Sequence, residues 1–213
     1  MASATGTGRR AGLDRDEVVD AAVALVEAGG ADALSMRKLA AELGVATTTI
    51  YWHAGNRDEL ILAVVARVAE QTEPAEVTGD DLAERIVALA EQLWAASLAH
   101  RNVAALAHQA GATALLGHRY EEAMARELAE AGITGDAARD VVRAVMMVLA
   151  GFLVVGMRRP DAAAAAGRPE ALWLEDDADL PPETLTALAR PPDLPALFRA
   201  TLRGVVEGLG ADR

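Results

Sequence analysis

The sequence predicts an all-α fold in which an N-terminal three-helix unit with helix-turn-helix spacing precedes a larger helical domain. Of the 213 residues, 52% are hydrophobic but only 3% are aromatic, so aliphatic side chains must fill the core. These side chains recur along most of the chain at spacings of three and four, which is typical of helices with one buried face. Capping residues and glycines separate the repeats and mark where helices begin and end.

The first predicted helix follows Asp14, which fits an N-cap because Glu17 stands at the third helical position. The apolar stripe of this helix consists of Val18, Ala22, Leu25 and Val26. Gly29 and Gly30 end the helix, since glycine readily adopts the backbone conformation found at helix C-termini.

Three more helices are expected in the first third of the chain. Ser35 fits the cap of a short second helix that ends at Gly44, and a third helix begins near Thr47. The fourth helix runs from Asn56, another residue that suits an N-cap, to about Thr72. Glu73 and the proline after it stop this helix.

Helical spacing continues through the rest of the chain, with one interruption. The further predicted helices cover residues 82–100, 102–114, 117–131, 136–157 and 193–210. Residues 158–192 contain six of the eight prolines and are expected to form a long loop. Residues 1–12 are small and polar and are expected to form a flexible arm.

The helices at 136–157 and 193–210 offer more apolar surface than one chain readily hides. Residues 144–157 are apolar on almost every face, and the last helix carries a continuous apolar stripe. We expect these two helices to pair with their copies in a four-helix dimer interface. The run 144–157 spans 14 residues, which is short of the roughly 20 needed to cross a bilayer.

The segments Ser35–Val45 and Thr47–His53 form two short helices around a glycine-containing turn, which is the spacing of a helix-turn-helix. The second helix of such a unit enters the major groove of DNA. Threonine suits that position because its hydroxyl bonds base edges and its methyl group contacts thymine. Ile50 would anchor the helix inward, and the alternative interpretation is two ordinary core helices.

The tract from Leu34 to Leu62 resembles the TetR family of regulators, and in particular the tetracycline repressors. The resemblance is carried by the runs Arg37-Lys38-Leu39-Ala40, Leu43-Gly44-Val45, Tyr51-Trp52-His53 and Asn56-Arg57. It implies that Arg37 reads a base, that Thr47, Thr48, Thr49 and Tyr51 line the recognition helix, and that His53 and Arg57 hold phosphate. Trp52 completes the DNA-binding candidates, and its alternative role is packing at the domain edge. Ala46 departs from the family, in which a capping serine is common at this position.

The resemblance extends more faintly over most of the chain. It implies a homodimer in which residues 13–58 bind DNA and residues 59–213 bind a small effector and form the dimer. Large, polar-tipped or adaptable side chains suit the lining of an apolar cavity. The ligand-binding candidates of this kind are Trp94, His100, His108, Gln109, Tyr120, Met124, Met146 and Phe152. Core packing is the alternative for each of them.

Composition and motifs limit the other function classes. The chain has no cysteine, and no two of His100, His108 and His118 have the spacing of metal ligands on one helix face, so we predict no metal and no cofactor. The formal charge of −12 argues against indiscriminate nucleic-acid binding and leaves a helical adaptor as one alternative. An enzyme is another, but no catalytic triad or phosphate-binding loop stands out.

The sequence therefore predicts a cytoplasmic, non-enzymatic regulator without a membrane segment. We expect it to be a repressor that a small, largely hydrophobic effector releases from a palindromic DNA operator.

Overall fold

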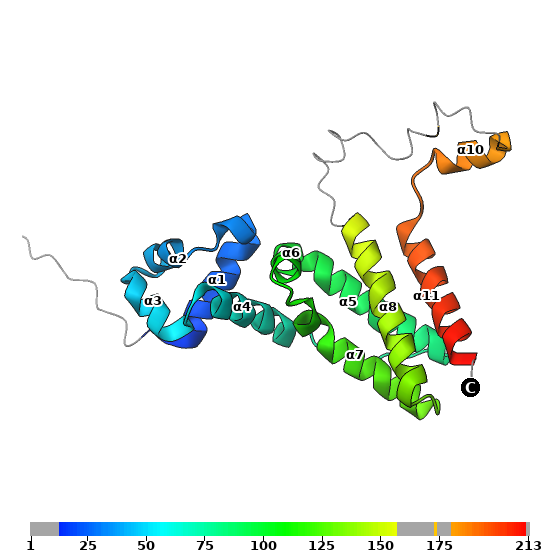
Figure 1. Cartoon of the computed structure of the whole chain (residues 1–213), viewed down its shortest axis with the longest axis horizontal. Helices are drawn as coiled ribbons and strands as arrows, with labels where there is room; N and C mark the ends of the chain where they lie inside the picture. The colour runs from blue at the N-terminus through cyan, green and yellow to red at the C-terminus, as the bar shows by residue number, and fades with distance from the viewer. Residues whose placement is uncertain (1–12, 157–172, 174–179, 212–213) are drawn as a thin grey trace, which may run out of the picture. The chain divides into compact units, whose positions relative to one another are not determined.

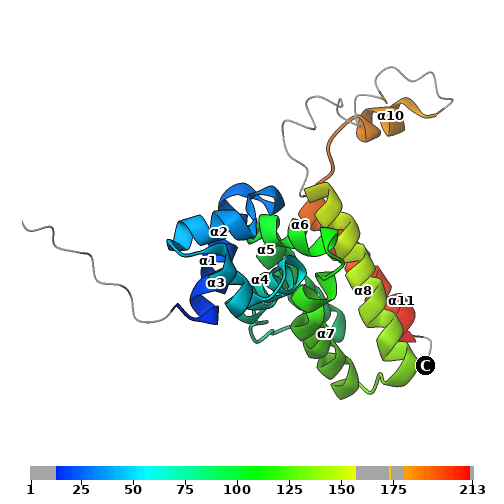
Figure 2. The same cartoon turned by 60° about the vertical axis from the view of Figure 1, so that its left-hand side comes forward.

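The computed structural model describes residues 13–156, 173 and 180–211, and the regular structure in these ranges is helical throughout (Figures 1 and 2). The predicted all-α class is therefore confirmed. Contacts between the helices divide the chain into two compact units. Within the described residues, the N-terminal unit runs to Glu73 and includes His100–His118, and the C-terminal unit comprises Pro74–Ala99 and the residues from Arg119 onward.

The N-terminal unit is a small helical bundle around an aliphatic core. It contains α1 (Arg15–Gly29), a 3₁₀ helix (Ala31–Ala33), α2 (Met36–Leu43), α3 (Thr47–Ala54), α4 (Arg57–Gln71), α6 (Arg101–Gln109) and the first residues of α7 (Thr113–Glu130). Helix α1 packs against α2, α3, α4 and α6. The fully buried core side chains include Val26, Leu39, Ile50, Leu60 and Leu106. The two compact units do not test the predicted assignment of DNA binding to residues 13–58 and of effector binding to residues 59–213. That assignment stays a prediction.

Two of the predicted N-caps form reciprocal hydrogen bonds at their helix ends. At α1, Asp14 Oδ1 accepts from the backbone N–H of Glu17 at 2.8 Å, and Glu17 Oε2 accepts from the backbone N–H of Asp14 at 3.2 Å. Asn56 and Glu59 make the same arrangement at α4. The first N–H groups of a helix have no partner within the helix, so these caps stabilise the starts that the sequence predicted.

Polar contacts join other helices to α1. Arg67 of α4 lies with Nη2 2.5 Å from Asp16 Oδ1 and pairs through Nη1 with Asp20. Both carboxylates are exposed, so each pair contributes about 1 kcal/mol or less. Asn102 of α6 donates through Nδ2 to the backbone carbonyl of Glu27 at 2.7 Å. These contacts hold α4 and α6 in register against α1.

The C-terminal unit contains α5 (Leu82–Ala99), the rest of α7, α8 (Gly135–Gly156), α10 (Pro182–Leu188) and α11 (Leu194–Ala211). Helix α11 packs along α8 and α5, and α5 also packs against α8. Side chains three or four residues apart meet in its core: Ile86, Leu89 and Leu93 of α5, Tyr120, Met124 and Leu128 of α7, Val141, Val145 and Leu149 of α8, and Phe198, Leu202 and Val206 of α11. A helix able to span a bilayer is not found in any described segment.

The prediction of a long loop at residues 158–192 is wrong in one part. Residues 182–188, inside the expected loop 158–192, form α10 with Pro182 as its first residue and Glu183 in its first turn. Proline suits the first helical position because the N–H it lacks has no helical partner there. The proline pair that indicated a loop therefore begins a helix. The expected arm at 1–12 lies outside the described residues, as do residues 158–172 and 174–179 of the loop.

Candidate functional site

Helices α2 and α3 form the helix-turn-helix that the sequence predicted. Ser35 caps α2, with Oγ accepting from the backbone N–H of Lys38 at 3.1 Å. Gly44 ends α2 at φ 67°, a left-handed conformation that glycine adopts without steric cost. The N–H of Val45 then donates to the carbonyl of Ala40 at 3.0 Å. This tight C-terminus turns the chain sharply into α3.

Helix α3 has one buried face and one free face. Ile50 and Ala54 are buried in the core of the N-terminal unit, whereas Tyr51 and Trp52 are 52% and 86% exposed. Gly55 ends the helix at φ 71°, and a Cβ at this position would collide with the side chain of Glu59. The fold therefore anchors α3 through its inner side chains and leaves its outer face open to a partner.

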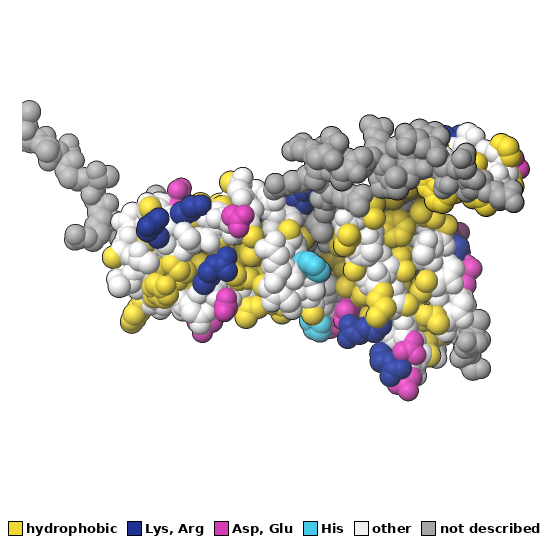
Figure 3. Space-filling view, turned by 45° about the horizontal axis from the view of Figure 1, so that its top comes forward, with side chains coloured by type: hydrophobic (Ala, Val, Ile, Leu, Met, Phe, Trp, Pro, Cys, Tyr) yellow, Lys and Arg dark blue, Asp and Glu magenta, His cyan; other side chains and the backbone are white. Residues whose placement is uncertain are grey.

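This part of an acidic chain carries a small net positive charge because it has few carboxylates. Residues 35–57 contain Arg37, Lys38 and Arg57 but only one carboxylate, Glu42, against a formal charge of −12 for the whole chain. Lys38 Nζ donates to the carbonyl of Asp32 at 3.3 Å. Figure 3 shows Lys and Arg side chains, with Asp and Glu side chains among them, on the visible face of the N-terminal helices.

The helix N-termini strengthen this local preference for anions. Helices α1 and α4 begin with acidic residues in their first turns, but α2 and α3 have none there. The unpaired N–H groups and dipole of a helix N-terminus attract anions when no carboxylate already occupies them. Ala46 provides no side-chain cap for α3, so the first N–H groups of this helix receive no hydrogen bond from the capping residue. The arrangement suits phosphate groups along α2 and α3.

The DNA-binding candidates all lie within one short stretch of the fold. Arg37 is on α2, Thr47, Thr48, Thr49, Tyr51, Trp52 and His53 are on α3, and Arg57 is the first residue of α4. Arg37, Thr48 and Arg57 are exposed, and Thr47, Thr49 and His53 are half-buried. The Trp52 ring meets the edge of His53 at a centroid distance of 5.8 Å and is otherwise open. That exposure favours contact with a partner over packing inside this unit, and the contact with DNA stays a prediction.

The ligand-binding candidates divide between the two units. His100, His108 and Gln109 belong to the N-terminal unit, where His108 and Gln109 are exposed on α6. His100 Nδ1 lies 3.0 Å from Glu27 Oε1, so this side chain already has a partner on α1. The other candidates, namely Trp94, Tyr120, Met124, Met146 and Phe152, belong to the C-terminal unit.

Three aromatic rings meet inside the C-terminal unit. The centroid of Trp94 lies 4.6 Å from that of Phe198 and 6.2 Å from that of Phe152, and the two phenylalanine rings lie 5.1 Å apart. Tyr120 and Met124 are buried in the same core, where burial raises the pKa of the Tyr120 phenol. Phe198 was missed by the sequence interpretation because its helical stripe indicated only packing.

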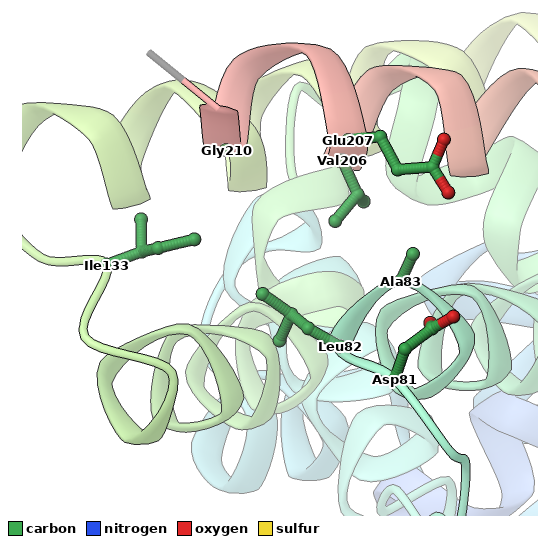
Figure 4. A pocket seen from close by; sticks show the side chains of 7 residues that line it. All are labelled: Asp81, Leu82, Ala83, Ile133, Val206, Glu207 and Gly210. Carbon is green, nitrogen blue, oxygen red and sulfur yellow. The ribbon is translucent and has the colours of Figure 1, made fainter. Parts of the chain in front are cut away.

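A pocket of about 430 Å³ lies elsewhere in the C-terminal unit (Figure 4). Its lining consists of Asp81, Leu82, Ala83, Ile133, Val206, Glu207 and Gly210, none of which was a sequence candidate. Arg203 lies 3.0 Å from Asp81 Oδ2 and 3.1 Å from Glu207 Oε1. The backbone N–H of Glu84 and the Arg203 guanidinium hold the pKa of Asp81 below its usual range. The two carboxylates at this pocket are thus already engaged by a cation of the same unit.

The described part of the chain contains no set of side chains that could bind a metal ion. No group of three or more His, Asp or Glu side chains comes together there in a way that would hold a metal ion.

Comparison with known proteins agrees with this architecture. Residues 18–64 match the family described as "Bacterial regulatory proteins, tetR family". An HTH-type transcriptional regulator of Saccharopolyspora erythraea is 38% identical over 96 residues, which is 45% of this chain and only 40% of the relative. The tetracycline repressor protein class A from transposon 1721 of Escherichia coli is 30% identical over 207 residues, which is 94% of this chain and 92% of the repressor.

A solved structure is similar over nearly the whole chain. ActR of Streptomyces coelicolor, a TetR family protein crystallised with actinorhodin, has a TM-score of 0.73 and 26% identity. The superposition covers 93% of this chain and 96% of ActR. Both the helix-turn-helix and the C-terminal helices therefore have counterparts in one known fold.

Proposed function

Since this chain belongs to the TetR family of bacterial regulatory proteins, we propose that it is a ligand-responsive, DNA-binding transcriptional regulator. It acts as a repressor that leaves a palindromic operator when a small, largely hydrophobic effector binds. The observation that carries the proposal is the open face of α3, which is anchored by Ile50 and presents Tyr51 and Trp52 to solvent. No catalytic step is part of this function.

The recognition helix α3 enters the major groove, and its neighbours contact the DNA backbone. Arg37 reads a guanine through a bidentate hydrogen bond, for which a free guanidinium is required. Arg57 and His53 hold phosphate groups. This division is supported by the exposure of both arginines and by the scarcity of carboxylates in residues 35–57. The acidic remainder of the chain limits binding to unrelated DNA.

The active species is a homodimer formed by α8 and α11. These helices pack along one another, yet large apolar side chains on them face solvent. Met147 is 74% exposed and Val154 is 64% exposed on α8, and Leu197 and Leu209 are exposed on α11. Figure 3 shows hydrophobic side chains gathered over the C-terminal helices. Exposed apolar surface of this kind marks protein interfaces, and a second copy of both helices would cover it.

The effector binds in the C-terminal unit and releases the operator by a population shift. A ligand that binds the DNA-incompetent conformation more tightly lowers operator affinity by the ratio of its two affinities. A small-molecule effector is supported by relatives that are named for tetracycline and by ActR, whose structure was determined with actinorhodin. The aliphatic and aromatic core of the unit favours a largely hydrophobic molecule.

The first test is selection of binding sites from a pool of random DNA duplexes at moderate salt, followed by sequencing of the retained fraction. Wild type should enrich a palindrome, and Arg37→Ala should lose enrichment at a symmetric pair of positions. Arg126→Ala is the matched control, because it removes an exposed arginine from α7 in the C-terminal unit. If neither wild type nor any variant enriched a sequence, the proposed DNA-binding function would be ruled out and a helical adaptor would be favoured.

A further inference from the structure

The indole N–H of Trp94 is a hydrogen-bond donor that has no acceptor in the folded chain. The Nε1 atom is buried, and it has no hydrogen-bond partner. Among the described residues it is the one buried side-chain nitrogen or oxygen in this condition. Folded proteins pair nearly all such atoms, and an unpaired one calls for a specific explanation, such as a ligand that is absent. The donor is therefore a candidate contact for a bound molecule.

The surroundings of this donor are rich in aromatic rings in a chain that has few of them. The sequence contains only two phenylalanines, and both Phe152 and Phe198 lie against Trp94. The rest of this core is built almost entirely from aliphatic side chains and methionine. Ring faces and edges stack favourably on planar aromatic molecules. The three rings thus suit contact with a flat, apolar scaffold better than the aliphatic part of the core does.

The end of α8 lies next to this donor. Gly156 has no side chain, and a Cβ there would lie 3.7 Å from Trp94 Nε1. Residue 156 thus places no side chain over the N–H, and an acceptor can reach the N–H from this side once the helices separate. Trp94 belongs to α5, Phe152 to α8 and Phe198 to α11, so a ring inserted among them must push these helices apart.

We propose that Trp94 is the hydrogen-bond donor of the effector site, and that the effector is a planar, largely hydrophobic ring system that carries a carbonyl oxygen. The regulatory role of this ligand rests on the function proposed above, whereas its binding at Trp94 does not depend on that function. Phe152 and Phe198 stack on the ring system while the indole N–H donates to its carbonyl. Separation of α5, α8 and α11 then connects binding to the two helices assigned to the dimer interface.

A matched pair of probes tests the role of the carbonyl. 9-Fluorenone is a planar ketone, and fluorene is the hydrocarbon of the same size without the acceptor. Full-length protein labelled with ¹⁵N at the tryptophan indoles is titrated with each probe, and the Trp94 signal is assigned with Trp94→Phe. Fluorenone should move the Trp94 indole proton downfield, fluorene should not, and the signal of exposed Trp52 should stay in place.

The affinities provide the second readout. One neutral hydrogen bond should make fluorenone bind wild type about two- to tenfold more tightly than fluorene, and Trp94→Phe should bind both probes equally. Three results would overturn the proposal: fluorenone does not bind wild type, its preference survives in Trp94→Phe, or the Trp94 signal does not move on binding. The titration on wild type decides the matter even if Trp94→Phe folds poorly.

The operator selection described above keeps this proposal separate from the proposed function. That selection uses no probe, so enrichment of a palindrome without fluorenone binding would remove only the role of Trp94. Conversely, fluorenone binding through Trp94 without any DNA enrichment would support the binding site but rule out the proposed function as a DNA-binding regulator.

Discussion

Replacing Arg37 by alanine is expected to weaken operator binding without weakening the fold. The side chain is exposed in the first turn of α2, and within the described structure it makes no hydrogen bond or ion pair. Its removal therefore leaves no described side chain without a partner. A cation at a helix N-terminus is also disfavoured by the helix dipole. The free energy of unfolding should therefore change by less than about 0.5 kcal/mol.

The expected loss of operator affinity follows from the contact assigned to this side chain. A bidentate bond to guanine contributes about 1 to 3 kcal/mol of discrimination, which corresponds to a loss of roughly 5- to 150-fold. The loss should be confined to operators that carry guanine at the contacted position. Arg57→Ala should behave differently, because a phosphate contact affects all sequences alike and its removal reduces the salt slope by about 0.9.

Fluorescence anisotropy of labelled duplexes distinguishes these roles. Each variant is titrated into the selected operator and its single-base derivatives at several salt concentrations. Arg126→Ala controls for the change of net charge, since it alters the charge of the chain by the same amount as Arg37→Ala. Chemical denaturation of each variant confirms that the fold is retained.

Two outcomes would refute the reasoning about Arg37. A uniform loss of affinity across all duplexes with a smaller salt slope would make Arg37 a phosphate contact. Affinity equal to that of the Arg126→Ala control on every duplex would mean that α2 does not read DNA through this residue.

The remaining predictions concern stability and assembly. Ala46→Ser should add the missing cap of α3 and raise the free energy of unfolding by about 1 kcal/mol, as measured by urea denaturation; an unchanged midpoint would contradict this. Because its pKa is lowered in the folded chain, Asp81 stabilises the fold fully above its unfolded pKa and loses that contribution as pH falls through the folded value, below about pH 4. Asp81→Asn should thus lose less stability than wild type in acid titrations, and an equal loss would exclude this role. Met147→Glu should shift the protein toward monomer in sedimentation velocity, whereas Leu115→Glu, on an exposed site of α7, should remain dimeric.

Several helix ends were predictable because they depend on residues within one turn. The predicted boundary between the helices at 102–114 and 117–131 was wrong, since α6 ends at Gln109 and α7 begins at Thr113. Asp14, Ser35 and Asn56 cap their helices as the sequence indicated, and Gly44 adopts the left-handed conformation expected at a helix C-terminus. Their hydrogen bonds join residues two or three positions apart, so tertiary structure has little influence on them. The same local reasoning failed at Pro182, where a proline allows either a loop or a helix start.

The candidate ligand site was less predictable, because a helical stripe shows that a residue is buried but not what it meets. Trp94 and Phe152 were chosen as large aromatic residues, whereas Phe198 was assigned to packing although its ring contacts both of them. His100 was chosen as polar and adaptable, yet its partner is Glu27, distant in sequence. Only contacts between distant segments decide such pairings.

The sequence by itself determined the helical class, the helix-turn-helix and the DNA-binding candidates, since these depend on local periodicity, capping and a compact motif in residues 34–62. The tertiary structure alone decided that α6 packs with the N-terminal helices and that three rings from α5, α8 and α11 meet around an unpaired indole N–H. The physical reason is the range of the interactions. Caps and turns act within a few residues, whereas burial and hydrogen-bond satisfaction depend on which distant helices the core brings together.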